Sequence, residues 1–121
     1  MKAIEFLNID LDIESKEDIS PILKEFGNRV VIHRNEKCNK LFCASISTGY
    51  TEENEIIQEY FSLVNELSTN ARKIWDNCNK REFDFGFESG GSPNNFQSSL
   101  SASSIQSLAR IDGSVVITIY P

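Results

Sequence analysis

The residues of this sequence that could do chemistry are one histidine, three cysteines and a cluster of glutamates. His33 lies in a run of β-branched residues, and a general base there would need a neighbouring nucleophile that no motif supplies. His33, Cys38 and Cys43 are each five residues apart, which differs from the C-x-x-C spacing of zinc sites, and a fourth ligand is missing. Cys78 falls on an apolar helix stripe, which favours a place in the core. The sequence therefore predicts neither a catalytic residue nor a metal site.

A glycine pair and the run of acids are the remaining candidates. Gly90-Gly91 stands in a Ser-rich segment without the lysine and the glycine spacing of a phosphate-binding loop. The glutamates could supply paired carboxylates, but at the start of a helix such charges also compensate the helix dipole. They are Glu52, Glu53, Glu55 and Glu59. We therefore expect no nucleotide, no cofactor and no enzymatic activity.

The longest element that must position these residues is predicted to be one helix from Thr51 to Asn79. Its apolar residues recur at steps of three and four, as they do on one face of an α-helix. These residues are Ile57, Tyr60, Val64, Leu67, Ala71, Ile74 and Cys78, with Ile56, Phe61 and Trp75 widening the stripe. The run at 68–70 is a weak helix former and is where a bend would be expected.

The clearest strand pattern runs from Glu82 to Glu88. Phe83, Phe85 and Phe87 alternate with polar residues, so that three aromatic rings share one face of the strand. We expect this face to form the floor under the long helix, and we expect the sheet to be covered on one side only.

The other segments complete the predicted element order β-α-β-β-α-β-α-β. A first strand is expected over residues 2–11, ended by Asp10, Asp12 and Glu14. A helix then runs to Gly27 from Ser15 (the preferred start) or from Ser20, which would make Pro21 the first helical residue. A strand at 29–34, a polar turn at 35–40 and a strand at 41–47 are expected next, and an exposed loop is expected at 89–99. A helix is expected at 101–111, with Ile105, Leu108 and Ala109 on its apolar side. The last element is a strand at 115–120, with Val115, Ile117 and Ile119 on one face.

This order predicts the α+β class. We expect a two-layer sandwich in which a mixed or antiparallel sheet of about five strands carries its helices on one face. The 121 residues are expected to form a single domain over residues 1–121.

Charge and composition narrow the function. Eighteen acidic residues against twelve basic ones give a net charge of −6, which disfavours a nucleic-acid partner. Residues 1–59 hold twelve acids and seven bases, so most of the excess lies in that half. No apolar run could span a bilayer, and the acidic residue near the N-terminus does not fit a signal peptide. Three cysteines fit a reducing compartment, so we expect a cytoplasmic protein without a membrane partner.

Two stretches carry a resemblance to a known family. The first is Asp10-Leu11-Asp12-Ile13-Glu14 leading to Leu23-Lys24-Glu25-Phe26-Gly27. The second is Glu88-Ser89-Gly90-Gly91, followed by Leu100-Ser101, Leu108-Ala109 and Val115-Val116-Ile117-Thr118-Ile119-Tyr120. In this order and spacing the chain resembles the bacterial family catalogued as domain of unknown function 4279. That resemblance implies an α+β fold with no established activity, and small acidic domains of this kind look like immunity proteins, which bind and block a toxin.

Three hypotheses follow. The leading one is a non-enzymatic immunity protein that binds a cationic toxin domain, such as a nuclease, through the glutamates at 52, 53, 55 and 59. The second is a small-molecule-binding or enzymatic domain that uses the 89–99 loop as a lid, with Ser92, Asn94 and Asn95 as polar contacts. The third is a structural module that dimerises through an edge of its sheet.

Overall fold

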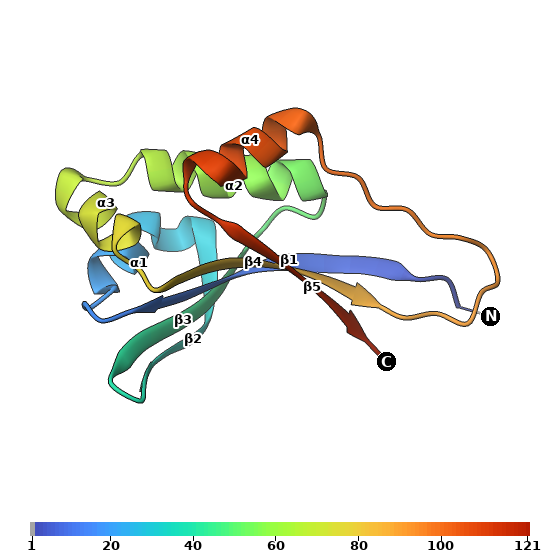
Figure 1. The fold of residues 1–121 in the computed structure, drawn as a ribbon, viewed down its shortest axis with the longest axis horizontal. Helices are drawn as coiled ribbons and strands as arrows, with labels where there is room; N and C mark the ends of the chain where they lie inside the picture. Colours follow the sequence, from blue (N-terminus) through green and yellow to red (C-terminus); the bar gives the residue numbers. More distant parts are fainter. Residues whose placement is uncertain (1) are drawn as a thin grey trace.

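A computed structural model describes residues 2–121 and shows a mixed α/β fold of two layers (Figure 1). These residues form five strands, four α-helices and one 3-10 helix. In chain order they are β1 (Glu5–Ser15), α1 (Ser20–Phe26), η1 (Gly27–Arg29), β2 (Val30–Cys38), β3 (Leu41–Thr48), α2 (Glu53–Asn65), α3 (Thr69–Asp76), β4 (Lys80–Glu88), α4 (Ala102–Arg110) and β5 (Ser114–Tyr120). None of these helices is long and apolar enough to cross a membrane.

The strands form one mixed sheet in the order β2-β3-β1-β4-β5. All neighbouring pairs are antiparallel except β4 and β5, which are parallel and are joined through α4. A parallel pair needs a crossover connection, and α4 with the long loop before it forms this connection between β4 and β5. The predicted two-layer α+β sandwich is therefore confirmed.

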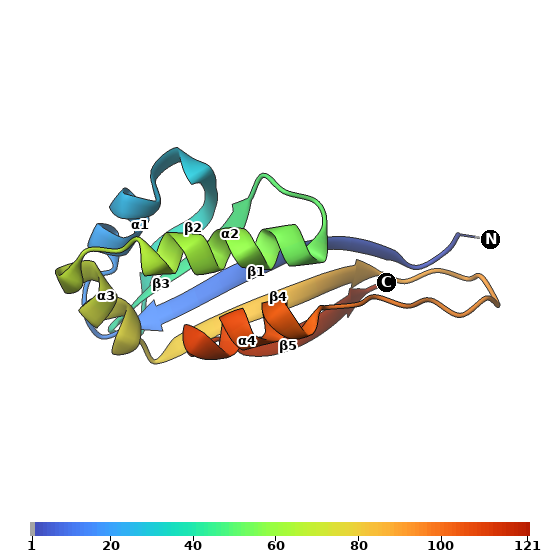
Figure 2. The same ribbon diagram turned by 90° about the horizontal axis from the view of Figure 1, so that it is seen from above.

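The four α-helices of the described chain lie on one face of this sheet (Figures 1 and 2). Between the layers lies one apolar core, to which β1 and β4 contribute alternate residues. Phe83, Phe85 and Phe87 all point into it, as expected from the sequence. Tyr60 of α2 stands edge-on to Phe83, with 5.3 Å between the ring centroids. The opposite face of the sheet has no helix against it (Figure 1).

The prediction of a single rod over residues 51–79 is wrong, because two helices occupy this segment. α2 ends at Asn65, and α3 begins after Ser68, whose hydroxyl caps it by accepting the Ala71 N–H at 3.2 Å. Both the Ser68 N–H and its hydroxyl also donate to Glu25 at 2.7 Å, which ties the break to α1. Serine is a favourable N-cap but a weak residue inside a helix, so Ser68 favours two helices over one continuous helix.

The prediction that Asp10, Asp12 and Glu14 end the first strand is also wrong, because β1 continues to Ser15. These acids alternate with buried apolar residues along the strand and point to the uncovered face of the sheet. A register irregularity between Phe6 and Asn8 lets the chain change phase, so that Phe6 lies against the Phe87 ring at 5.6 Å. This bulge accounts for the apolar residues that occupy both phases at the start of the strand.

Two boundaries near the N-terminal half need correction. The first helix starts at Ser20 with Pro21 in its first turn, so the preferred start at Ser15 is wrong and the later start is nearly right. The hairpin turn is shorter than predicted, since β2 reaches Cys38 and only two residues separate it from β3. Those residues, Asn39 and Lys40, have φ of 49° and 72°, as a tight type I′ connection requires.

Helix α4 packs on α2 through polar contacts, which the sequence pattern did not indicate. Ser104 and Ser107 are buried and face Gln58, whose side-chain amide donates to both hydroxyls at 3.4 and 3.3 Å. Asn54 accepts the Ser104 hydroxyl at 2.9 Å. Ile105, which was predicted to lie on the apolar side, is 55% exposed.

Candidate partner-binding surfaces

Of the glutamates selected from the sequence, Glu52, Glu53 and Glu55 lie at the N-terminal end of α2, whereas Glu59 lies in its middle. Glu52 and Glu59 both make contacts within the chain. Glu52 is the cap of the helix and accepts the Glu55 N–H at 2.8 Å. That bond holds the pKa of the Glu52 carboxyl below its usual value. Glu59 binds the Arg29 guanidinium at two points, 2.6 and 3.2 Å, and thereby ties α2 to η1. This pairing raises the pKa of Arg29.

The other two glutamates are less engaged. Glu53 accepts a long hydrogen bond, 3.4 Å, from the Ser98 hydroxyl of the loop before α4. The Glu55 carboxylate has no hydrogen bond or ion pair with another described residue, and its side chain borders a shallow hollow beside Tyr50. The four glutamates thus extend from the cap to the middle of α2, and three of them have partners within the chain. Their role as a partner-binding site stays a prediction.

A second acidic surface lies on the uncovered face of the sheet. Asp10 of β1 stands directly opposite Asp84 of β4, and Asp12 stands opposite Glu82. Like charges in directly opposed positions of neighbouring strands destabilise a sheet. At one end of this face the Lys80 ammonium lies 3.8 Å from Glu14 and 3.7 Å from Glu82. We call Asp10, Asp12, Glu82 and Asp84 the acidic sheet face.

The pKa of the Asp10 carboxyl is raised above its usual value. Partial burial is the main cause that raises the pKa of its carboxyl, and the negative charges of Asp12 and Asp84 raise it further. The positive form of His33 acts in the opposite direction. The ring of His33 is itself engaged, since Nε2 lies 2.7 Å from the Ser47 hydroxyl. Asp84 accepts a hydrogen bond of 2.7 Å from Thr118 on β5.

Neutralising Asp10 should therefore stabilise the fold. Because the folded-state pKa of Asp10 is raised, its ionised form costs stability above that pKa, and the cost disappears as the pH falls through that pKa towards the ordinary pKa of an aspartate. We expect Asp10→Asn to raise the free energy of unfolding by about 0.5 kcal/mol at pH 7, with the gain fading at acidic pH. Urea denaturation of both proteins at several pH values measures the difference.

Glu14→Gln is the matched control on the same strand and face. Glu14 has Lys80 beside it, so its neutralisation should give no gain in stability. A loss of stability in Asp10→Asn at pH 7 would show that the Asp10 charge is favourable in the folded protein.

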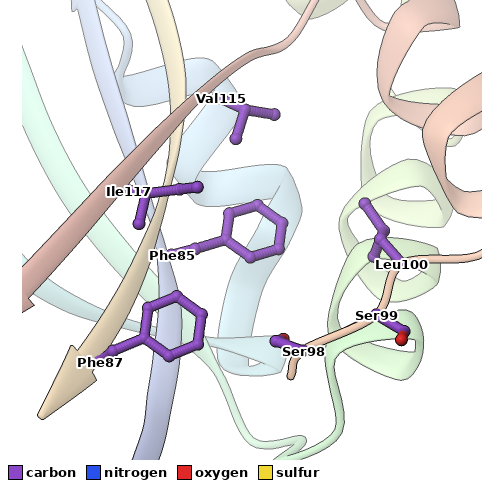
Figure 3. Close-up of a pocket in the computed structure, with 7 residues that line it drawn as sticks. All are labelled: Phe85, Phe87, Ser98, Ser99, Leu100, Val115 and Ile117. Atoms are coloured by element: carbon purple, nitrogen blue, oxygen red, sulfur yellow. The ribbon is translucent and has the colours of Figure 1, made fainter. Parts of the chain in front are cut away.

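An apolar groove lies under the loop before α4, on the helix side of the sheet (Figure 3). Phe85 and Phe87 of β4 form its floor, Ile117 of β5 lies beside them, and Leu100 closes the loop side. Its volume is about 210 Å³, which is below the range typical of ligand pockets. The polar residues expected to contact a ligand there do not line it. These are Ser92, Asn94 and Asn95, and the loop contributes Ser98 and Ser99 instead.

The three cysteines and the histidine do not gather at one place, although the Cys38 and Cys43 side chains lie near each other. Cys38, Cys43 and Cys78 are free thiols in the described chain, and no group of three or more His, Cys, Asp or Glu side chains within residues 2–121 is placed to hold a metal ion. Cys78 is buried, as the apolar stripe predicted, and its thiol donates to the Ile74 carbonyl. Burial raises the pKa of its thiol to about 11, so the thiol is protonated at neutral pH.

Sequence reasoning missed the acidic sheet face, although the signal was present. From Ile9 to Ser15 every second residue is apolar or small and every other one is acidic, which is the alternation of a strand with one buried face. Because these acids were interpreted as the end of the strand, their position on one face of the sheet was not recognised. Their proximity to Asp84 could be known only once β1 and β4 were seen to pair.

Comparisons of the chain with models of protein families, with curated proteins and with solved structures give no match. The resemblance to domain of unknown function 4279 thus stays a prediction.

Proposed function

We propose that this chain is a non-enzymatic, cytoplasmic immunity protein that binds and neutralises a cognate cationic bacterial toxin domain. The observation that carries the proposal is the acidic sheet face, where Asp10 opposes Asp84 on a surface that no helix covers. A fold gains nothing from opposed carboxylates on its own account. Lysine and arginine side chains of a partner would relieve that repulsion.

The shape of this surface supports the proposal. A sheet face without helices offers a broad, rigid platform, and acidic residues from two adjacent strands focus its negative potential. A basic cleft, such as that of a nuclease, would meet complementary charge there, and charge complementarity speeds association and selects the partner. The acidic sheet face therefore replaces the glutamates of α2 as the first surface to test, because those glutamates have more internal contacts.

Protection in a living cell tests the proposal. The reading frames that flank this gene are first searched for a secreted protein with a C-terminal toxin domain, and that domain is then co-expressed with this chain in a bacterium. We expect the wild type to restore growth and the double variant Asp10→Asn/Asp84→Asn to lower survival at least about tenfold, since two charges that attract the toxin are lost. Neutralising Asp10 is expected to stabilise the fold, but Asp84 also accepts a hydrogen bond from Thr118. Urea denaturation of the double variant therefore checks that a loss of protection does not reflect unfolding.

Two further pairs locate the surface. Glu53→Gln/Glu55→Gln removes the same charge from the start of α2 and should have the smaller effect, whereas Glu17→Gln/Asp76→Asn removes it elsewhere and should have none. If the α2 pair abolishes protection and the sheet pair does not, the partner binds at the glutamates. If the wild type itself gives no protection and no binding, the proposed function is wrong.

A further inference from the structure

The two edges of the sheet differ in a way that indicates a partner strand. One edge is β2, which carries His33, Arg34, Glu36 and Lys37 and has a register irregularity after Ile32. Charges and bulges of this kind protect an edge strand from pairing with another chain. The other edge is β5, whose sequence from Ser114 to Tyr120 contains no charge, no proline and no glycine. β5 is therefore an unprotected edge.

The free hydrogen-bonding groups of β5 can be assigned to particular residues. The Tyr120 carbonyl accepts the Ser89 N–H at 2.7 Å, so the backbone groups of Tyr120 point towards β4. Both backbone groups of a strand residue point to the same side, and the side alternates along the strand. It follows that Val115, Ile117 and Ile119 direct their N–H and C=O groups to the open edge, where no described residue pairs with them.

The side chains of the same three residues are also exposed. They lie in register with Phe83, Phe85 and Phe87 and thus on the helix side of the sheet, but α4 does not cover them. Ile117 is 66% exposed, and it borders the groove described above. Free backbone groups and an apolar row therefore coincide on one strand.

We infer that β5 pairs antiparallel with β5 of a second copy of this chain, around a two-fold axis at Ile117. This register sets Ile117 opposite its own counterpart and Val115 opposite Ile119 of the other copy. All three residues have outward backbone groups, so about six hydrogen bonds would form between the copies. Three apolar pairs would meet on the helix side, and the self-complementary row is what a two-fold interface requires.

The charge distribution restricts contact between two copies to surfaces such as β5. The chain carries a net charge of −6, so two copies repel each other across most of their surface. β5 has no charged residue, and Asp10 and Asp84 lie on β1 and β4, on the opposite face of the sheet from the apolar row. The pairing would bring no acid opposite another acid, and it would leave the acidic sheet faces of both copies open.

Sedimentation velocity over a concentration series from roughly 1 to 300 µM tests the inference. We expect the wild type to move from the 13.7 kDa monomer to twice that mass as the concentration rises. Ile117→Lys places two ammonium groups opposite each other and should keep the protein monomeric, with a rise in Kd of at least about tenfold. Val31→Lys, on the other edge strand at a side chain that is 55% exposed, is the matched control and should dimerise like the wild type.

A mixture of Ile117→Lys with Ile117→Glu gives the sharpest result. If residue 117 faces its own counterpart, the two variants should each be monomeric and their equimolar mixture should dimerise. A wild type that stays monomeric throughout, a dimer that survives Ile117→Lys, or a mixture that stays monomeric would each overturn the inference. The Asp10 and Asp84 variants should leave the mass unchanged, so the dimer and the proposed toxin binding can fail independently.

Discussion

Trp75→Ala is expected to lower the free energy of unfolding by about 3–5 kcal/mol, since it removes a large side chain from the interior. Trp75 of α3 is 0% exposed, and its indole N–H donates to the Ile111 carbonyl at 2.9 Å. The ring thus fills the core and joins α3 to the turn between α4 and β5. Its loss would leave both a cavity and a buried carbonyl without a donor.

Trp75→Phe separates these two effects because it keeps an aromatic ring but removes the indole N–H. We expect it to cost less than the alanine variant, about 1–3 kcal/mol. Urea denaturation followed by circular dichroism is the suitable measurement, because Trp75 is the only tryptophan and the variants lose indole fluorescence. A cost below about 1 kcal/mol for Trp75→Ala would place the ring at the surface.

Tyr60→Ala is expected to have a similar cost, about 3–5 kcal/mol, for a different structural reason. Tyr60 is 0% exposed, and its hydroxyl lies 3.0 Å from the Ile9 carbonyl and 3.2 Å from the Ile46 carbonyl. Pairing between β1 and β3 starts at Leu11, so the hydroxyl reaches the place where these two strands separate. Burial raises the pKa of Tyr60, in keeping with a hydroxyl that stays protonated as a donor.

Tyr60→Phe is the control for the hydroxyl. It keeps the ring against Phe83 and removes only the donor, so we expect a loss of about 1–3 kcal/mol from the carbonyls left unsatisfied. The same denaturation assay compares both variants. Equal stability of Tyr60→Phe and the wild type would mean that the hydrogen bonds of the Tyr60 hydroxyl do not contribute to the free energy of unfolding.

The parts of the fold that could be predicted from the sequence are those where side-chain period and burial agree. Phe83, Phe85 and Phe87 alternate with polar residues, and this alternation alone placed β4 with its aromatic face inward. The two-layer arrangement followed from the same pattern, since a strand with one polar face needs cover on the other face only.

The parts that failed depend on contacts between distant segments. Ser68 could be a weak helical residue or a cap, and its bonds to Glu25 of α1 are what favour the cap. Ile105 has helical spacing with Leu108, but buried Ser104 and Ser107 turn α4 towards Gln58. No local sequence pattern predicts that Ser104 and Ser107 pair with Gln58.

The candidate site could be predicted from the sequence only in part, for the same reason. The glutamates at the start of α2 were found because four acids are close in sequence, yet Glu59 is held by Arg29, thirty residues away. Asp10 and Asp84 are far apart in sequence and become neighbours only through the pairing of β1 with β4. A surface made by two strands cannot be recognised until their register is known.

The association rate constant with the toxin domain is the measurement that tests the role of the acidic sheet face most directly. Wild type and Asp10→Asn/Asp84→Asn are compared by stopped flow at low and at physiological salt. We expect the variant to associate at least about tenfold more slowly at low salt and to depend less on salt, because long-range attraction is reduced. Equal rates and equal salt dependence would contradict the account, since the partner would then bind without using the charges of the sheet.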